Sequence, residues 1–104
     1  MTPTKEALMT TLRIDNTVRD FDSWKTVFDK FERFRRDHGV RSYRLSRDVT
    51  EPNRVTIDLD FDTQPEAETF LGSLWKIWET PQSKAQVIDS RAPRMLDVVV
   101  HRAL

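Results

Sequence analysis

A stripe of aromatic residues in the first third of the chain constrains the fold more than any other feature. Between residues 20 and 38, apolar side chains recur at spacings of three and four, which places them along one face of a helix. They are Phe21, Trp24, Val27, Phe28, Phe31 and Phe34. A face with this many rings needs a broad apolar surface to cover it, most simply a β-sheet. The stripe therefore predicts one helix packed on a sheet, with Phe28 and Phe31 almost fully buried.

Charges and a glycine mark the two ends of this helix. Asp20 or Asp22 suits the N-terminus as a capping residue, because its carboxylate accepts hydrogen bonds from free amides. Basic residues crowd the last turn, namely Arg33, Arg35, Arg36 and His38. Gly39 can adopt the left-handed conformation that ends a helix. We predict a continuous helix to about His38.

Four segments with alternating side chains predict strands at residues 8–15, 40–47, 54–62 and 95–101. The clearest is 54–62, where Val55, Ile57, Leu59 and Phe61 face one way and Thr56, Asp58, Asp60 and Asp62 the other. Pro52 and Asn53 predict a hairpin loop at 48–53. In the last strand, we expect Leu96, Val98 and Val100 to face the core, with Met95, Asp97, Val99 and His101 opposite.

The second half of the chain adds helices. Thr63 to Glu66 has the form of a capping box and predicts the start of a second helix. Thr80-Pro81 ends that helix and begins a short third one to about Asp89. The order is β-α-β-β-α-(α)-β, the ferredoxin-like α+β pattern: an antiparallel four-stranded sheet with helices on one face. We expect a flexible lead at residues 1–7 and a single domain at 8–104.

The amino-acid composition limits the kinds of molecule that we expect the protein to bind. The chain has 104 residues, 17 basic and 17 acidic side chains and no cysteine. A formal net charge of zero gives no electrostatic reason to expect nucleic acid or an anionic membrane. No apolar run approaches the roughly 20 residues of a membrane span, and the N-terminus lacks the features of a signal peptide. We expect a soluble cytoplasmic protein.

The sheet face away from the helices is expected to carry the polar residues Thr11, Arg13, Ser42, Arg44, Asp58, Asp60, Asp97 and His101, with Val99. It is either a solvated, salt-bridged face or a polar cavity between two such sheets. Arg13 and Arg44 either pair with Asp58 or Asp60, or bind a carboxylate or phenolate. His101 is a possible general base. Alternating carboxylates lie too far apart for one metal ion, and the sequence has no Gly-rich phosphate loop, so we expect no metal and no organic cofactor.

Three stretches carry a family resemblance: FDSWKTVFD, HGVRSYRL and RVTIDLDFDT. They resemble the dimeric α+β barrel superfamily, in particular small proteins grouped with antibiotic-biosynthesis monooxygenase-like (ABM-like) domains, over roughly Leu8 to His101. The resemblance implies a homodimer whose sheets meet face to face. In catalytic members it also implies a pocket between each sheet and its own helices. The superfamily includes cofactor-independent monooxygenases, haem-degrading enzymes, small isomerases and cyclases.

The resemblance also implies site residues. Asn16 and Trp75 fall near the positions of an asparagine and a tryptophan that the monooxygenases and haem degraders use. Asn16 would then hold an enolate or peroxide oxygen, and Trp75 would stack on an aromatic substrate; otherwise Asn16 is a turn residue and Trp75 belongs to the core. Haem degraders need a histidine soon after the tryptophan, where this chain has Gln82, Ser83 and Lys84. We therefore expect no haem binding.

Three classes of function remain open. The first is a cofactor-independent monooxygenase or cyclase/isomerase of aromatic or polyketide-like molecules, with Asn16, Trp75, His101 and Arg13 as catalytic candidates and Arg44, Asp58 and Tyr43 as substrate-binding candidates. The second is a dimeric domain that binds a small molecule without catalysis. The third is a structural dimer without a ligand. A cavity lined by Asn16 and Trp75 would favour the first two classes, and a filled helix–sheet interface the third.

Overall fold

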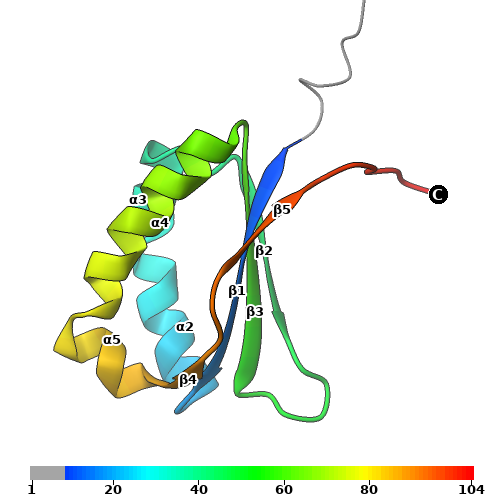
Figure 1. Cartoon of the computed structure of the whole chain (residues 1–104). Helices are drawn as coiled ribbons and strands as arrows, with labels where there is room; N and C mark the ends of the chain where they lie inside the picture. Colours follow the sequence, from blue (N-terminus) through cyan, green and yellow to red (C-terminus); the bar gives the residue numbers. More distant parts are fainter. Residues whose placement is uncertain (1–8) are drawn as a thin grey trace, which may run out of the picture.

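A computed structural model describes residues 9–104, which form one antiparallel sheet with helices on one face only (Figure 1). The expected lead at residues 1–7, and the expected first strand residue Leu8, lie outside the described part. Within that part, no helix combines the length and the apolar character needed to cross a membrane. The elements are β1 (Thr10–Val18), α2 (Phe21–Lys30), α3 (Glu32–Asp37), β2 (Ser42–Arg47), β3 (Arg54–Phe61), α4 (Gln64–Trp78), α5 (Pro81–Gln86), β4 (Val87–Ser90) and β5 (Arg94–Asp97).

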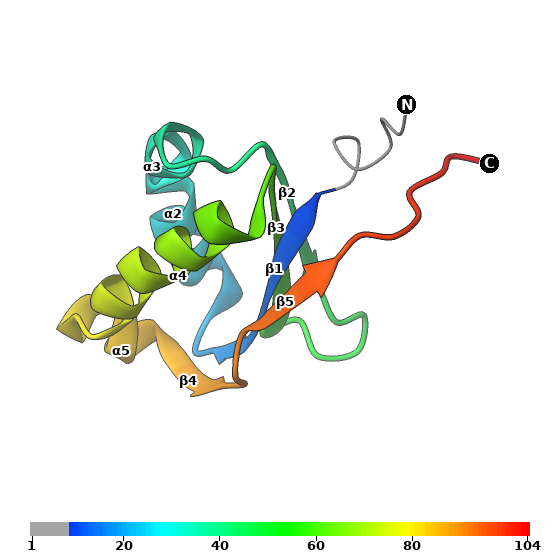
Figure 2. The same ribbon diagram turned by 45° about the horizontal axis from the view of Figure 1, so that its top comes forward.

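The strands run in the order β2-β3-β1-β4, and β5 also pairs with β1. β5 pairs with the first part of β1, opposite Thr10 to Arg13, and β4 pairs with the last part, opposite Asn16 to Val18. Figure 2 shows β5 alongside β1 and β4 near α5. The predicted ferredoxin-like fold is confirmed, with one difference: two short strands take the place of the single last strand.

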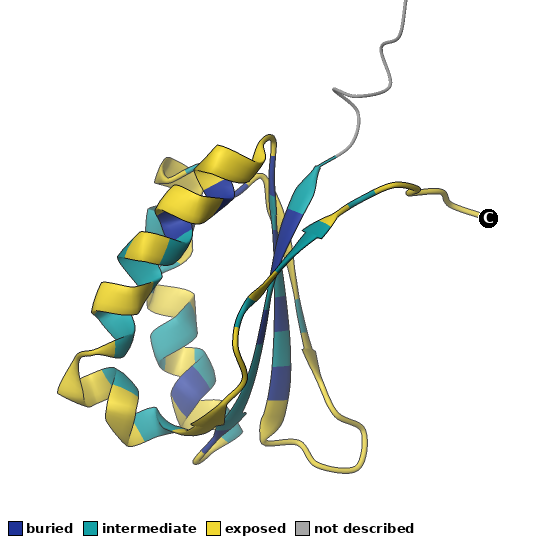
Figure 3. Cartoon of the chain, in the orientation of Figure 1, coloured by how far each residue is buried: buried dark blue, intermediate teal, exposed yellow. Residues whose placement is uncertain are grey.

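The core lies between the sheet and the helices. Leu12 lies opposite Leu59, and Ile14 lies opposite Ile57, so the alternation predicted for these strands is confirmed by their register. All four side chains are buried. Phe70 of α4 is also buried, and Figure 3 shows the buried residues gathered where the helices face the sheet. Burial of this apolar surface is the main contribution to the stability of the fold.

The continuous helix predicted to His38 is wrong, because the chain breaks between α2 and α3. At Phe31 the backbone amide bonds to the carbonyl of Phe28, three residues back, at 3.2 Å, and the φ and ψ angles are −96° and 14°. Arg35 then donates from Nη2 to the same Phe28 carbonyl at 2.9 Å. The Phe28 carbonyl thus accepts two hydrogen bonds, one from the Phe31 amide in the tightened turn and one from the Arg35 side chain.

The predicted end of the first strand and the predicted third helix both need correction. β1 continues past Asp15 to Val18, so Asn16 lies within a strand rather than in a turn. α5 ends at Gln86 rather than near Asp89, and the next four residues form β4. Both changes have one cause: residues 16–18 of β1 offer a free edge, and β4 pairs with it.

The last strand is shorter than expected, and its two faces are reversed. β5 covers Arg94–Asp97, with Met95 opposite Leu12 and Leu96 opposite Thr11. Met95 therefore packs against the core, and Leu96 lies on the face away from the helices. His101 lies beyond β5 in an exposed segment, so its expected place in a strand is wrong.

Short-range signals predicted the remaining features correctly. The Asp20 carboxylate caps α2 by accepting from the Ser23 amide at 2.9 Å. Thr63 caps α4 by accepting from the Glu66 amide at 3.3 Å, as a capping box requires. Gly39 has a φ of 96°, the left-handed conformation that glycine adopts without strain.

Candidate ligand site

A cavity of about 250 Å³ lies between the sheet and the helices. Aromatic rings dominate its wall: Trp24, Phe28, Phe31, Phe34, Phe70 and Trp78. Phe28 and Phe31 are half-buried rather than almost fully buried, and both line this space. The expectation that they fill the core is therefore wrong. The interface between helices and sheet therefore contains a cavity with aromatic walls. A purely structural dimer was expected to have a filled helix–sheet interface instead.

A second cavity of about 270 Å³ adjoins the first. The two share Ile14, Asn16, Trp78, Ser83 and Val87 in their walls. The second cavity is also lined by Trp75, so the fold brings the two residues singled out by the resemblance, Asn16 and Trp75, to one space. Besides Asn16 and Arg35, the polar side chains of the first cavity lie in and beside α5, at Thr80, Gln82, Ser83 and Gln86.

Asn16 lies at the junction of these cavities because β1 extends past its predicted end. In register it lies opposite Val55 on one side and Ser90 on the other. It follows Ile14 by two residues, so its side chain is on the helix-facing side of the sheet. Among residues 9–104, its side-chain amide forms no hydrogen bond, which leaves both a donor and an acceptor free for a ligand.

Trp75 is not part of the core, which was the alternative to its stacking role. Its side chain is 50% exposed, and its ring lies edge-on to Trp78 with the centroids 5.0 Å apart. The two rings therefore form a wall of the second cavity that a flat molecule can reach from solvent.

Arg35 is the site residue that sequence analysis missed. It is only 5% exposed, it lines the first cavity, and its guanidinium carbon lies 3.8 Å from the centroid of the Phe28 ring. Its Nε is buried and has no hydrogen-bond partner among the described residues. A signal was present in the sequence: Trp24, Phe28, Phe31 and Arg35 follow at spacings of four, three and four, which puts an arginine in the apolar stripe.

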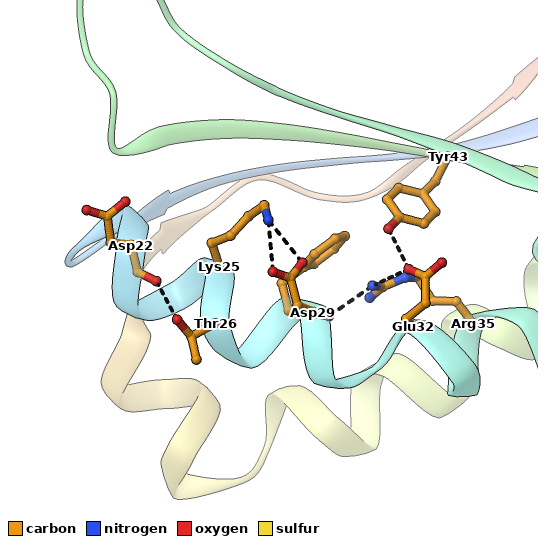
Figure 4. A network of polar contacts seen from close by, with 8 residues as sticks. Asp22, Lys25, Thr26, Asp29, Glu32, Arg35 and Tyr43 are labelled. Atoms are coloured by element: carbon orange, nitrogen blue, oxygen red, sulfur yellow. Dashed lines mark hydrogen bonds and ion pairs between the residues drawn. The ribbon is translucent and has the colours of Figure 1, made fainter.

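Tyr43 belongs to a polar network beside this cavity (Figure 4). Its hydroxyl donates to the Glu32 carboxylate at 2.5 Å, and its ring lies edge-on to Phe28. This hydrogen bond lowers the pKa of Glu32 and raises the pKa of Tyr43. The walls of the two cavities, as residues 9–104 define them, do not include Tyr43, which acts on the site through Glu32 and Phe28.

On the other face of the sheet, polar side chains pair with one another. Arg13 donates to Asp58 at 2.8 Å, and this hydrogen bond raises the pKa of Arg13. Thr11 and Ser42 both donate to Asp60, at 2.6 and 2.9 Å. Of the two interpretations left open for this face, the salt-bridged one describes Arg13 and Asp58. Arg44, on β2, lies opposite Asp58 of β3.

One hollow at the end of the sheet is lined mainly by polar side chains. It has a volume of about 480 Å³ and is lined by Arg47, Arg54 and Arg91 together with Asp15, Asp48 and Asp89. Because the charges are balanced, it has no net preference for an anion or a cation. Within residues 9–104, no three His, Cys, Asp or Glu side chains lie close enough together to hold a metal ion.

No protein-family model matches the sequence, and no curated protein does. Solved structures do resemble the fold. A dimeric ferredoxin-like protein from an uncultured marine organism matches with a TM-score of 0.69 and 13% identity, over 91% of this chain and 98% of that one. A second dimeric ferredoxin-like protein from an uncultured marine organism has a TM-score of 0.64 and 10% identity, over 96% and 95% of the two chains.

PA3566 from Pseudomonas aeruginosa matches with a TM-score of 0.63 and 11% identity, over 91% of this chain and 98% of that one. At identities this low, the likeness establishes the fold and nothing finer. The chain is an α+β protein of the ferredoxin-like fold.

Proposed function

We propose that this protein is a homodimer that binds a small aromatic or polyketide-like molecule between its sheet and its helices. The observation that carries the proposal is the aromatic wall of the 250 Å³ cavity. An apolar cavity of about 150 Å³ is enough to hold benzene, so this space suits a molecule of two or more rings. Ligand sites commonly combine such apolar walls with a few polar groups that orient the ligand.

Binding can be tested by thermal shift and by the fluorescence of Trp24 and Trp78, which both line the cavity. Quinones and aromatic acids form the panel, and a ligand present at 100 times its Kd stabilises the fold by about 2.7 kcal/mol. The variant Leu74→Trp should fill the cavity and abolish the shift while the protein still folds. Val49→Trp, in an exposed loop, is the matched control. A panel without any stabilising member, or equal shifts in both variants, would contradict the proposal.

A second candidate function, catalysis, is favoured by the position of Asn16. Its free amide shares a cavity with Trp75 and Trp78, so a stacked ring could present an oxygen to it. The ABM-like resemblance implies a cofactor-independent monooxygenase or a cyclase/isomerase. Such substrates form carbanions readily, so orientation, exclusion of water and one oxyanion donor supply much of the rate enhancement.

The test of catalysis separates binding from turnover. Oxygen uptake is measured with reduced members of the quinone panel. Ring closure or isomerisation, which leaves the mass of the substrate unchanged, is followed by the change in absorbance. Asn16→Ala should lower kcat by about 10²-fold, the usual loss for one oxyanion donor, with the ligand Kd changed little. Lys76→Ala, on the exposed side of α4, is the control. Equal turnover in Asn16→Ala and the parent protein would overturn the catalytic role of Asn16, and no turnover in either would leave binding as the function.

The homodimer is supported by the uncovered face of the sheet. Leu96 lies on that face, opposite the polar residue Thr11. Figure 1 shows that no helix covers this side of the sheet. Two solved proteins of the same fold are described as dimeric. We expect light scattering to give twice the chain mass of 12.3 kDa. Leu96→Asp should shift the mass toward the monomer, and Val49→Asp should not. A mass of one chain at every micromolar concentration would contradict the dimer.

A further inference from the structure

Arg35 places a positive charge in the wall of a mainly apolar cavity, and no other charged side chain among the described residues lines it. The residue is 95% removed from solvent, since only 5% of its surface is exposed. A guanidinium keeps its charge when it is buried. A buried charge is tolerated when counter-charges and hydrogen bonds replace the lost water.

The contacts around Arg35 replace that water only in part. Nη2 donates to the carbonyl of Phe28 at 2.9 Å and lies 3.4 Å from the Glu32 carboxylate. The Glu32 side chain is half exposed, and the same carboxylate also accepts from Tyr43 and lies 3.8 Å from Arg36. The rings of Phe28 and Tyr43 cover the guanidinium. Figure 4 shows Arg35 beside Glu32 and Tyr43.

One fully buried donor atom has no partner after these contacts. Nε of Arg35 is shielded from solvent and has no acceptor among residues 9–104. An unmet buried donor of a charged group is unfavourable, so a structural role alone leaves this atom unexplained. Arg35 also lines the cavity, and because Nε is closed to a water-sized probe, the side chain must turn slightly for an acceptor in that space to reach this atom.

We propose that the ligand of this cavity is an aromatic acid, and that its carboxylate or phenolate oxygen accepts a hydrogen bond from Nε of Arg35. This inference rests on the proposed ligand-binding function and names the chemical class of the ligand. The aromatic rings of the wall hold the body of the molecule, and Arg35 selects its charged end. Charge-assisted hydrogen bonds of this kind are roughly twice as strong as neutral ones.

The experiment compares probes of one shape and different charge. The probes are 2-naphthoate, 2-naphthamide and 2-methylnaphthalene, titrated at pH 7.5 and followed by tryptophan fluorescence and calorimetry. We expect the parent protein to bind 2-naphthoate at least tenfold more tightly than either neutral probe. A desolvated charge-assisted hydrogen bond is sufficient for a difference of that size.

Variants assign this preference to one side chain. Arg35→Met should abolish the preference for the acid while the affinity for 2-methylnaphthalene changes less than threefold. Arg35→Lys keeps the charge but lacks Nε, so it should keep part of the preference for the acid. If Arg35→Met does not fold, Arg35→Lys is used in its place. Arg33→Met is the control, since Arg33 is on the same helix with its side chain 89% exposed.

The outcomes separate this inference from the function on which it rests. If the parent protein binds the acid and the neutral probes equally, the role of Arg35 is overturned and the binding function stands. If the preference survives in Arg35→Met, or disappears equally in Arg33→Met, the role of Arg35 is likewise overturned. If none of the probes binds, and the wider panel also fails, the proposed function itself is overturned together with this inference.

Discussion

The guanidinium of Arg13 holds the carboxylate of Asp58 through two hydrogen bonds, 2.8 Å from Nε to Oδ1 and 3.0 Å from Nη2 to Oδ2. The two residues lie directly opposite each other on β1 and β3, on the face away from the helices. Their side chains are 36% and 18% exposed, so solvent screens the pair only in part. The pair lies on the surface that the proposed dimer would cover.

A double-mutant cycle should measure this pair directly. We expect Arg13→Met, Asp58→Asn and the double variant to give a coupling of about 1 kcal/mol in urea unfolding, the upper end for partly exposed ion pairs. The more exposed pair of Lys25 and Asp29 on α2, with side chains 43% and 52% exposed, provides the comparison, with an expected coupling of about 0.3–0.5 kcal/mol. A coupling no larger than that of the helical pair would mean that the two hydrogen bonds contribute no extra stability.

Because of the cavity, aromatic residues of the same region should contribute unequally to the stability of the fold. Phe70 is 2% exposed and packs on Phe61, whereas Phe31 is half-buried on the cavity wall. Phe70→Ala should destabilise the fold by about 3–5 kcal/mol, and Phe31→Ala by about 1 kcal/mol, because truncation on a cavity wall removes fewer contacts. Denaturant melts of both variants check the difference. Equal losses would mean that the space between helices and sheet is closed in solution.

The contact between Tyr43 and Glu32 predicts a pH dependence of stability. The hydrogen bond lowers the pKa of Glu32 below 4.5, so this stabilisation is complete above 4.5 and is lost as pH falls through the folded-state pKa. The same bond raises the pKa of Tyr43 above 10.0, so the stabilisation is present below 10 and is lost as pH rises through the raised value. Stability from the pair is therefore level between about pH 4.5 and 10.

Tyr43→Phe tests this dependence, since it removes the donor and keeps the ring. The difference in unfolding free energy between the parent protein and Tyr43→Phe should be constant from pH 5 to 9 and should shrink below pH 4.5. Glu51→Gln, in the exposed hairpin loop, is the control for general acid effects. A difference that grows on acidification would contradict the assignment.

Haem should not bind specifically. The segment after Trp75 has Gln82, Ser83 and Lys84 where the haem-degrading proteins that the sequence resembles would place an axial histidine. The two histidines lie elsewhere: His38 stacks on Phe34 at the end of α3, and His101 is in the exposed segment after β5. Titration with haemin should give only weak, unsaturable binding. A Soret shift that saturates at one equivalent per chain, and that is lost in Trp75→Ala, would refute this expectation.

Periodicity and short-range signals were sufficient for most of the fold. The alternation of Val55, Ile57, Leu59 and Phe61 predicted both the strand and its buried face, because a one-residue slip would expose every apolar side chain. The capping box at Thr63 predicted the start of α4. Long-range pairing was harder to predict. The residues of β5 have apolar neighbours on both parities, so only the pairing of Met95 with Leu12 decides which side faces the core.

The site was predictable only in part. The resemblance directed attention to Asn16 and Trp75, and the structure brings both to one cavity. It did not point to Arg35, and the roles proposed for Asn16, Trp75, Arg13, Arg44, Asp58, Tyr43 and His101 remain predictions. His101 was assigned to a strand face because an uninterrupted strand was assumed, yet β5 ends at Asp97.

The sequence by itself determined the positions of the main strands and helices and the buried faces of β1 and β3, because these depend on spacings within a few residues. Tertiary structure alone decided that the helix breaks at Phe31, where Arg35 reaches back to the carbonyl of Phe28. It alone decided that Asn16 lies in a strand, because β4 pairs with that edge. The cavity also belongs to the tertiary level: an aromatic stripe supplies rings, but how closely the helices approach the sheet determines whether those rings fill the core or surround a space.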